Sequence, residues 1–376
     1  MFTSLFVKIT ALLVALTFSL GNFFGVYKPS TTENPEDYFN GNIKNVIYLI
    51  GDGMGFNHLE KTKKERSTLL AMDSFEIKGS SRTRSVNKKV TDSAAGGTAL
   101  ACGVRTDNSA IGVYHLDKKP KYSYPKSITE LCIERGMLTG VVTTDETSGA
   151  TPSAFSAHSS DRYNVEDITA DQLGSEIDII WGAENGVATK EAAEKNGFTY
   201  VTTYSEMMAL PEGGRSFAQF KNSLWTLDQS DENTPNLEQM AVKAVDILDD
   251  SDEGFFLMIE GAHIDKHSHN NLSAEATEAL LEFDRTVEAM LEYARNDGET
   301  LVIVTADHET GGITLKDGGY VFTDDGHTAA DVAVLVYGSE SFIRNGEKIN
   351  NYEISIRIAY TLGADKSQYP VSVLCN

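Results

Sequence analysis

Residues 255–269 read Phe-Phe-Leu-Met-Ile-Glu-Gly-Ala-His-Ile-Asp-Lys-His-Ser-His, and this segment decides the fold of the chain. The apolar run at its start predicts a short strand that is buried on both faces of a parallel sheet. Glu260 then lies at the carboxyl end of that strand. If a helix begins near Ile264, Asp265 and His269 share one helical face and can bind one divalent cation. An isolated pair with this spacing is more often part of a solvated polar loop, so other ligands decide the matter.

Two other predicted strands also end in potential metal ligands. The apolar run 45–50 leads into Gly-Asp-Gly-Met-Gly, which contains Asp52, and the run 301–305 leads into Ala-Asp-His-Glu-Thr-Gly-Gly, which contains Asp307 and His308. Glycines beside an aspartate allow the backbone to turn sharply and to approach a ligand. Open α/β sheets bind ligands at the carboxyl ends of their strands, so these segments indicate a shared metal site.

The histidines support this interpretation. Of the eight in the chain, five fall in three late segments that also carry candidate ligands. His327 stands in Gly-His-Thr, just before the predicted strand 332–336. His263 and His267 receive no role, and we expect them to be exposed or to lie behind the ligands.

A hydroxyl group is predicted at the start of a helix. The sequence Val-Thr-Asp-Ser, residues 90–93, leads into a run of small residues that allows close helix packing. Ser93 is either an ordinary N-cap serine or a nucleophile in the positive field of a helix N-terminus. No Gly-x-Ser-x-Gly motif surrounds Ser93, which disfavours an α/β-hydrolase triad.

The middle of the chain adds two weaker candidates after the predicted strand 138–144. Thr151 could offer an oxygen to a hard cation, and Arg162 could bind phosphate through two parallel hydrogen bonds. Taken singly, each is more often a surface residue. The remaining segments, including the helical patterns 237–248 and 273–295, are interpreted as structural framework.

The charge of the chain limits its partners. The 32 basic residues face 55 acidic ones, a formal net charge of -23, which repels nucleic-acid backbones and anionic lipid surfaces. We therefore expect no nucleic-acid partner. A small anionic substrate would need a locally positive site, which metal ions could supply.

The amino terminus resembles an export signal. Lys8 precedes an apolar run, and Ser-Leu-Gly at 19–21 is an acceptable cleavage site, so residues 1–21 are predicted to be a signal peptide and residues 22–42 a linker. The alternative is an uncleaved anchor, for which the run is marginal in length. We expect a periplasmic or secreted protein without stable membrane association after cleavage.

The three cysteines are an odd number, so one intramolecular disulfide at most can form among them. Cys102 and Cys132 lie in apolar helical patterns and are predicted to be buried thiols. Cys375 is near the end of the chain, and no cysteine spacing suggests a zinc knuckle.

Six motifs in one order resemble the alkaline phosphatase family over residues 45–338. They are Gly-Asp-Gly-Met-Gly at 51–55, Thr-Asp-Ser-Ala at 91–94, Ala-Thr-Pro at 150–152 with Arg162 beyond, Glu-Gly-Ala-His-Ile-Asp-Lys at 260–266, Thr-Ala-Asp-His-Glu-Thr-Gly at 305–311, and Gly-His-Thr at 326–328.

The resemblance implies a role for each candidate. Ser93 would be the nucleophile that becomes a phosphoserine, with Arg162, oriented by Asp92, on the substrate phosphate. The implied ligands of one zinc ion are Asp265, His269 and His327. Those of a second zinc ion are Asp52, Asp307 and His308, with Ser93 approaching it. A magnesium ion would share Asp52 and add Thr151 and Glu260.

Some positions depart from better-known members of the family. Two residues before the threonine ligand, many relatives carry an aspartate or histidine, whereas this chain has Gly149. Occupancy of the third metal site is therefore in question. Lys266 matches a lysine that reaches phosphate in some bacterial members. The short segment between His308 and His327 argues against large insertions.

The implied protein is a metal-dependent phosphate monoester hydrolase with two zinc ions and one magnesium ion, and by resemblance a homodimer. We expect a three-layer α/β/α sandwich with a mostly parallel central sheet, formed by residues 43–376 as one domain. The alternatives are a phosphodiesterase or sulfatase of the same superfamily, and, from another class, an exported metal- or phosphate-binding protein without turnover. The pairing of Ser93 with Arg162 favours the monoesterase.

Overall fold

The structure is a computed structural model, which describes residues 26–27, 31–115, 122–221 and 233–374. The predicted signal peptide and Cys375 lie outside the described residues. Over the part of the chain that is described, no helix is long and apolar enough to span a membrane.

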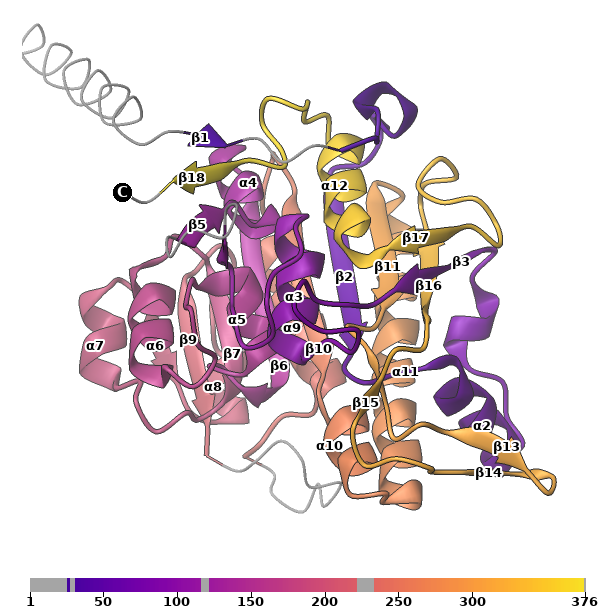
Figure 1. Cartoon of the computed structure of the whole chain (residues 1–376). Helices are drawn as coiled ribbons and strands as arrows, with labels where there is room; N and C mark the ends of the chain where they lie inside the picture. The colour runs from indigo at the N-terminus through magenta and orange to yellow at the C-terminus, as the bar shows by residue number, and fades with distance from the viewer. Residues whose placement is uncertain (1–25, 28–30, 116–121, 222–232, 375–376) are drawn as a thin grey trace, which may run out of the picture.

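A ten-stranded sheet runs through the centre of the described chain (Figure 1). In spatial order its strands are β17 (Lys348–Asn350), β3 (Ile77–Arg82), β16 (Val332–Tyr337), β11 (Thr300–Thr305), β2 (Asn45–Gly51), β10 (Phe255–Gly261), β6 (Leu138–Glu146), β7 (Ile179–Ala183), β9 (Ser216–Phe220) and β8 (Thr199–Val201). Neighbours from β11 to β8 are parallel, and β16 runs antiparallel to both β11 and β3. The predicted α/β class with a mostly parallel sheet is confirmed.

The apolar runs form the most buried strands. Every residue of β10 is buried, and β10 pairs in parallel with β2 on one side and β6 on the other. Along β2, Ile47 and Leu49 enter one hydrophobic cluster, while Val46, Tyr48 and Ile50 enter another on the opposite face. A strand covered on both faces has no position for a polar side chain, which is why these runs show no alternation.

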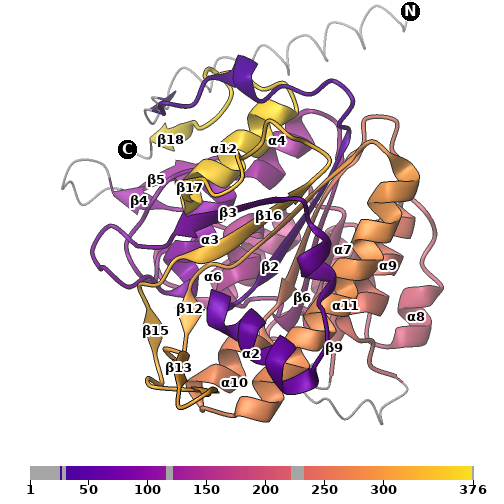
Figure 2. The ribbon, with the colours of Figure 1, turned by 90° about the vertical axis from the view of Figure 1, so that its right-hand side faces the viewer.

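Helices cover both faces of the sheet (Figure 2). The cluster on one face takes in α9 (Leu237–Leu248) and α11 (Ser273–Asp297). The opposite cluster takes in α3 (Ser93–Cys102), α4 (Ile128–Glu134), α5 (Ala150–Ser156), α6 (Val165–Gly174) and α12 (Asn351–Thr361). The remaining described helices are η1 (Pro35–Asp37), α2 (Phe56–Arg66), η2 (Ala71–Ser74), α7 (Lys190–Lys195), α8 (Tyr204–Met208) and α10 (His263–His269). These layers are the predicted α/β/α sandwich.

Among the described residues, three small sheets lie outside the main one. A four-stranded sheet has the order β1 (Val26–Tyr27), β18 (Ser372–Leu374), β5 (Tyr122–Pro125) and β4 (Tyr114–His115). The strand β13 (Thr314–Lys316) pairs with β14 (Gly319–Val321), and β12 (Glu309–Thr310) pairs with β15 (His327–Thr328). The β12–β15 pair matters for function, because it sets Thr310 opposite His327 in the strand register.

The described part of segment 22–42 contacts the rest of the protein. The strand β1 pairs with β18, Glu33 forms an ion pair with Arg357, and the ring of Tyr38 lies 6.4 Å from that of Tyr360. This segment therefore adds a strand and side-chain contacts to the domain beside it.

The strand β8 and the helix α8 follow each other closely in the chain. The strand β8 ends at Val201, and α8 begins at Tyr204 because Thr203 caps that helix by accepting a hydrogen bond from the backbone N–H of Glu206. Cys102 and Cys132 are buried free thiols, as predicted.

Replacing Leu257 in β10 by alanine should lower the free energy of unfolding by about 2–5 kcal/mol, because the side chain is fully buried and its removal leaves a cavity. Urea unfolding of the purified protein measures the change. Leu69→Ala is the matched control: Leu69 is 82% exposed, and its loss should change the free energy by less than about 0.5 kcal/mol. Equal effects of the two substitutions would contradict the burial of β10.

Candidate active site

The carboxyl ends of three adjacent strands bring the candidate ligands together. The register pairs Gly51 with Gly261, and Ile50 with both Glu260 and Thr305, so β2, β10 and β11 end at the same level. Asp52 and Asp307 follow directly, and both are buried, as is Glu260. The predicted convergence of three strand ends is therefore present in the fold.

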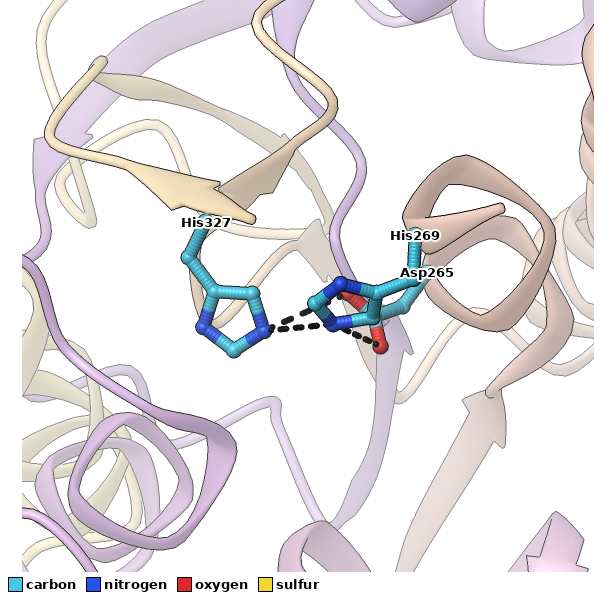
Figure 3. A group of neighbouring side chains, drawn as sticks. All are labelled: Asp265, His269 and His327. Atoms are coloured by element: carbon cyan, nitrogen blue, oxygen red, sulfur yellow. Dashed lines mark hydrogen bonds and ion pairs between the residues drawn. The ribbon is translucent and has the colours of Figure 1, made fainter. Parts of the chain in front are cut away.

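Asp265, His269 and His327 form the first ligand cluster (Figure 3). The Nε2 atoms of the two histidines lie 3.0 Å apart, and they lie 3.3 Å and 3.6 Å from the Asp265 carboxylate oxygens. The Nδ1–H of His269 donates to the carbonyl of Asp325 at 2.6 Å, and that of His327 to the carbonyl of Thr91 at 2.9 Å. These bonds direct both Nε2 lone pairs to one point, where a proton or a metal ion is needed between them.

His308 is the centre of the second ligand cluster. Its Nε2 lies 3.5 Å from Asp52 Oδ1 and 3.0 Å from Asp307 Oδ2. Ligand atoms of Asp52, Asp265 and His308 lie within 4.8 Å of one another, so Asp265 stands between the two clusters. The rings of His308 and His327 stack, with centroids 3.5 Å apart.

Several buried oxygen atoms of the predicted ligands have no hydrogen-bond partner among the described residues. Thr151 Oγ1 and Glu260 Oε1 are buried, and neither has a hydrogen-bond partner among the described residues. The other Glu260 oxygen, Oε2, accepts a hydrogen bond from the hydroxyl of Thr143. Asp52 Oδ1 and Asp307 Oδ2 also make no hydrogen bond within the described chain. Buried oxygens of this kind need a donor or a cation, and hydroxyl and carboxylate oxygens suit magnesium.

The buried carboxyl groups of Asp52 and Glu260 both have raised pKa values. Burial, followed by the charges of Asp307, Asp265 and Glu260, raises the pKa of Asp52 well above its usual value. Burial and the charge of Asp145 raise the pKa of Glu260 to about 8. Cations would lower both pKa values and restore the ionised forms.

In the first cluster, the hydrogen bond between His269 and Asp265 shifts the pKa of both groups. Burial works to raise the pKa of Asp265, but its hydrogen bond with His269 and the charge of His308 hold it below the usual value. The hydrogen bond to Asp265 raises the pKa of His269 to about 9. Burial and the charge of His308 lower the pKa of His327 to about 4. The raised pKa of His269 means that, without metal, its Nε2 holds a second proton at neutral pH.

Ser93 is the first residue of α3 and faces His308, the centre of the second ligand cluster. Its Oγ lies 3.1 Å from Nε2 of His308, and the residue is only 4% exposed. The interpretation of Ser93 as an N-cap is wrong, because the N-cap is Asp92, whose Oδ1 accepts a hydrogen bond from the backbone N–H of Ala95 at 3.0 Å. The Ser93 hydroxyl is thus not used to cap the helix.

Arg162 and Lys266, the two side chains predicted to bind phosphate, are each held by a carboxylate. Arg162 lies 3.5 Å from Oδ2 of Asp92, the partner expected from the sequence. Lys266, which directly follows Asp265, forms an ion pair with Asp145. Its pKa is raised: burial works against the charged form, but the charge and hydrogen bond of Asp145, together with the charges of Glu260 and Asp52, outweigh it.

Sequence reasoning missed several residues at the site. The hydroxyl of Thr310 donates to Asp265 Oδ1, and Asp145 holds Lys266. A shallow cavity of about 540 Å³ opens beside the first cluster; it is lined by Lys88, Lys89, Val90, Thr91, Asp92, Asn108, His269 and His327. The position of Asp145 at a strand end was the one available signal, whereas nothing local marks the others.

The remaining histidines of this region support the framework. His58 accepts a hydrogen bond from the backbone N–H of Gly55 and bonds to Ser268, and it is buried. His263 and His267 are buried too, so the alternative that they are exposed is wrong. None of the three belongs to a ligand cluster among the described residues.

Comparison with known proteins identifies the family. The family profile described as alkaline phosphatase matches residues 43–181 and 182–330 of this chain. The chain belongs to the alkaline phosphatase family.

Individual relatives agree with this assignment. The chain is 35% identical over 308 residues to alkaline phosphatase 4 of Bacillus subtilis (strain 168), a match that covers 74% of this chain and 64% of that protein. The chain thus spans less than two thirds of that relative. The alkaline phosphatase from the Antarctic bacterium TAB5 superposes with a TM-score of 0.73 and 30% identity, covering 85% of this chain and 98% of that one. A histidine-to-glutamate variant of the TAB5 protein is described with magnesium bound in a site named M3.

Zinc binding to the metal-free protein should become tighter as the pH rises from 7 to 9. The pKa of His269 is raised to about 9, so its proton competes with the cation below that pH, and the competition ends above it. We expect the apparent affinity to rise up to about tenfold per pH unit, measured by competition with a chelating dye. His158→Gln, a change outside the cluster, should show the same pH dependence. An affinity that is flat across this range would contradict the protonated His269.

Proposed function

We propose that this protein is an alkaline phosphatase that hydrolyses phosphate monoesters through a phosphoserine on Ser93. The observation that carries the proposal is the position of the Ser93 hydroxyl. It is buried at the first residue of α3, 3.1 Å from His308, at the junction of two clusters of metal ligands. A serine placed there has the positive end of a helix behind it and potential cations in front.

The ligand sets fit three metal ions. We assign one zinc ion to Asp265, His269 and His327, a second to Asp52, Asp307 and His308, and a magnesium ion to Asp52, Thr151 and Glu260. The support is the shared direction of the imidazole Nε2 atoms and the buried oxygens that lack hydrogen bonds. When bound, such ions would supply positive charge that lowers the pKa of the Ser93 hydroxyl and stabilises the departing ester oxygen.

The residues of the chain then have distinct tasks. Arg162, oriented by Asp92, binds two oxygens of the phosphate through its planar guanidinium. After the Ser93 hydroxyl has lost its proton to solvent, Ser93 Oγ forms a bond to phosphorus while the bond from phosphorus to the ester oxygen breaks. The ester oxygen leaves with the electron pair and takes up a proton from water. Water then attacks the phosphoserine, which releases inorganic phosphate and restores Ser93. Both steps need the substrate dianion to be neutralised, and Arg162 and Lys266 contribute to this.

The cavity beside the first cluster provides space for the leaving group. It borders His269 and His327, the assigned ligands on the side of the departing oxygen. The contacts assigned here are to the phosphate group, which supports a broad choice of monoesters.

The alternatives differ from this proposal at the nucleophile and its partner. A sulfatase or phosphodiesterase of the same superfamily would hydrolyse sulfate esters or diesters faster than monoesters. A metal- or phosphate-binding protein would keep its affinity without turnover. Ser93 together with Arg162 supports the monoesterase over both alternatives.

The expected location and assembly stay predictions. Export through residues 1–21 would place the enzyme in the periplasm or outside the cell, and mass spectrometry of the mature protein would detect cleavage near Gly21. The homodimer expected from the family resemblance is testable by light scattering.

Chelation should abolish release of phosphate from an aryl phosphate monoester at alkaline pH, and zinc should restore it. The reason is that Ser93 and the leaving oxygen lose the positive charge that the ligand clusters hold. The assay compares untreated, chelated and zinc-restored protein on the monoester, the matching diester and the matching sulfate ester. Absence of monoester turnover by the zinc-loaded protein, or faster turnover of the diester or sulfate ester, would overturn the proposal.

Ser93→Ala should lower kcat for the monoester by at least about a thousandfold, because loss of a nucleophile removes the covalent route. Zinc content and phosphate affinity should change little. Ser205→Ala on the exposed face of α8 is the control and should retain full activity. Turnover that survives in Ser93→Ala, together with failure to trap a phosphoprotein from wild type, would remove Ser93 from its assigned role.

A further inference from the structure

Gly149 precedes α5, two residues before Thr151, and leaves space that another side chain fills. A Cβ atom at position 149 would lie 2.5 Å from Oδ2 and 2.8 Å from Cγ of Asp145. It would also lie 3.0 Å from the carbonyl oxygen of Glu146, so the position is closed from two sides. In protein structures, a Cβ atom essentially never lies this close to a heavy atom to which it is not bonded. The carboxylate of Asp145 can therefore stay where it is only if residue 149 has no side chain.

Asp145 is held firmly in this place at the end of β6. Its Oδ1 accepts a hydrogen bond from the backbone N–H of Glu146 at 2.8 Å and pairs with the ammonium of Lys266. Its own backbone N–H donates to Thr143 Oγ1 at 2.8 Å, and the Thr143 hydroxyl donates in turn to Glu260 Oε2. One network thus joins Asp145, Lys266 and Glu260, and it leaves Glu260 Oε1 without a hydrogen bond.

We propose that Asp145 is a positioning residue, which holds the Lys266 ammonium and is linked through Thr143 to Glu260 of the assigned cation site, and that Gly149 is required to make room for it. The Asp145 carboxylate extends from the end of β6 into the space next to Gly149. A side chain at position 149 would occupy the same space from the residue that precedes α5. The inference rests on the proposed function, because it assigns Lys266 to the phosphate and the Thr151–Glu260 site to a cation.

The charges around Lys266 support a specific role for Asp145. Asp145, Glu260 and Asp52 all act on the ammonium, and the charge of Asp145 has the largest effect of the three. An exposed ion pair would contribute little, but the side chain of Asp145 is only 20% exposed, and a Cβ atom at Gly149 would overlap it.

A carboxylate exchange tests the assignment. The variants are Asp145→Ala, Asp145→Asn, Gly149→Ala, the double variant Asp145→Ala/Gly149→Ala, and the exchange Asp145→Ala/Gly149→Asp. Glu146→Gln is the matched control, because Glu146 is the adjacent carboxylate and is exposed. Two readouts are measured on the zinc-loaded full chain: the rise in melting temperature with added magnesium, and the inhibition constant of inorganic phosphate. The second is compared with kcat and KM for the aryl phosphate.

We expect Asp145→Ala and Asp145→Asn to weaken magnesium-dependent stabilisation and phosphate inhibition by about tenfold or more in apparent affinity. Gly149→Ala should do the same in the wild-type background but change either readout less than about twofold when Asp145 is already alanine. The exchange variant should recover most of both readouts, and Glu146→Gln should match wild type.

Two results would overturn the inference. One is an Asp145→Asn protein with wild-type magnesium and phosphate readouts. The other is a Gly149→Ala effect of the same size with and without Asp145, because the glycine would then serve the backbone alone. Since the melting temperature needs no turnover, a wild-type protein without phosphatase activity would refute the proposed function while the magnesium readout still decides the role of Asp145.

Discussion

The convergence of buried carboxylates at one edge of the sheet is the constraint on which the rest of the site depends. Asp52, Glu260 and Asp307 meet there because β2, β10 and β11 are adjacent, parallel and level at their ends. Burial and mutual repulsion raise the pKa of Asp52 and Glu260, so the ionised forms are unfavourable without compensating charge. Metal binding would relieve this repulsion, which couples the ions to the stability of the strand ends.

The side chains of Arg162 and Lys266 are held by carboxylates that do not belong to the assigned metal-ligand sets. Asp92 caps α3 and contacts Arg162, so one residue fixes both the helix that carries Ser93 and the guanidinium that we assign to the phosphate. Asp145 does the corresponding task for Lys266. A protein with a net charge of -23 thus presents positive groups to an anionic substrate at a few fixed positions.

Sequence patterns predicted the framework well where burial is uniform. The strand in 255–259 and the helix 237–248 are present, because long apolar or amphipathic runs have one stable environment each. Short elements were less predictable. The start of α8 depends on the cap that Thr203 provides, and the role of Ser93 depended on which of two adjacent residues, Asp92 or Ser93, caps α3. Such competition between neighbouring side chains is decided by the chain around them.

The sequence by itself determined the strands, the ligand-bearing segments that end them, and the shared face of Asp265 and His269, because these follow from local periodicity. Only the tertiary structure decided which distant residues meet. His327 reaches His269 across 58 residues through the β12–β15 pair, and Asp145 reaches Lys266 across 121 residues in the space that Gly149 leaves. Contacts of this kind depend on strand order, register and the shape of neighbouring side chains, none of which a local pattern contains.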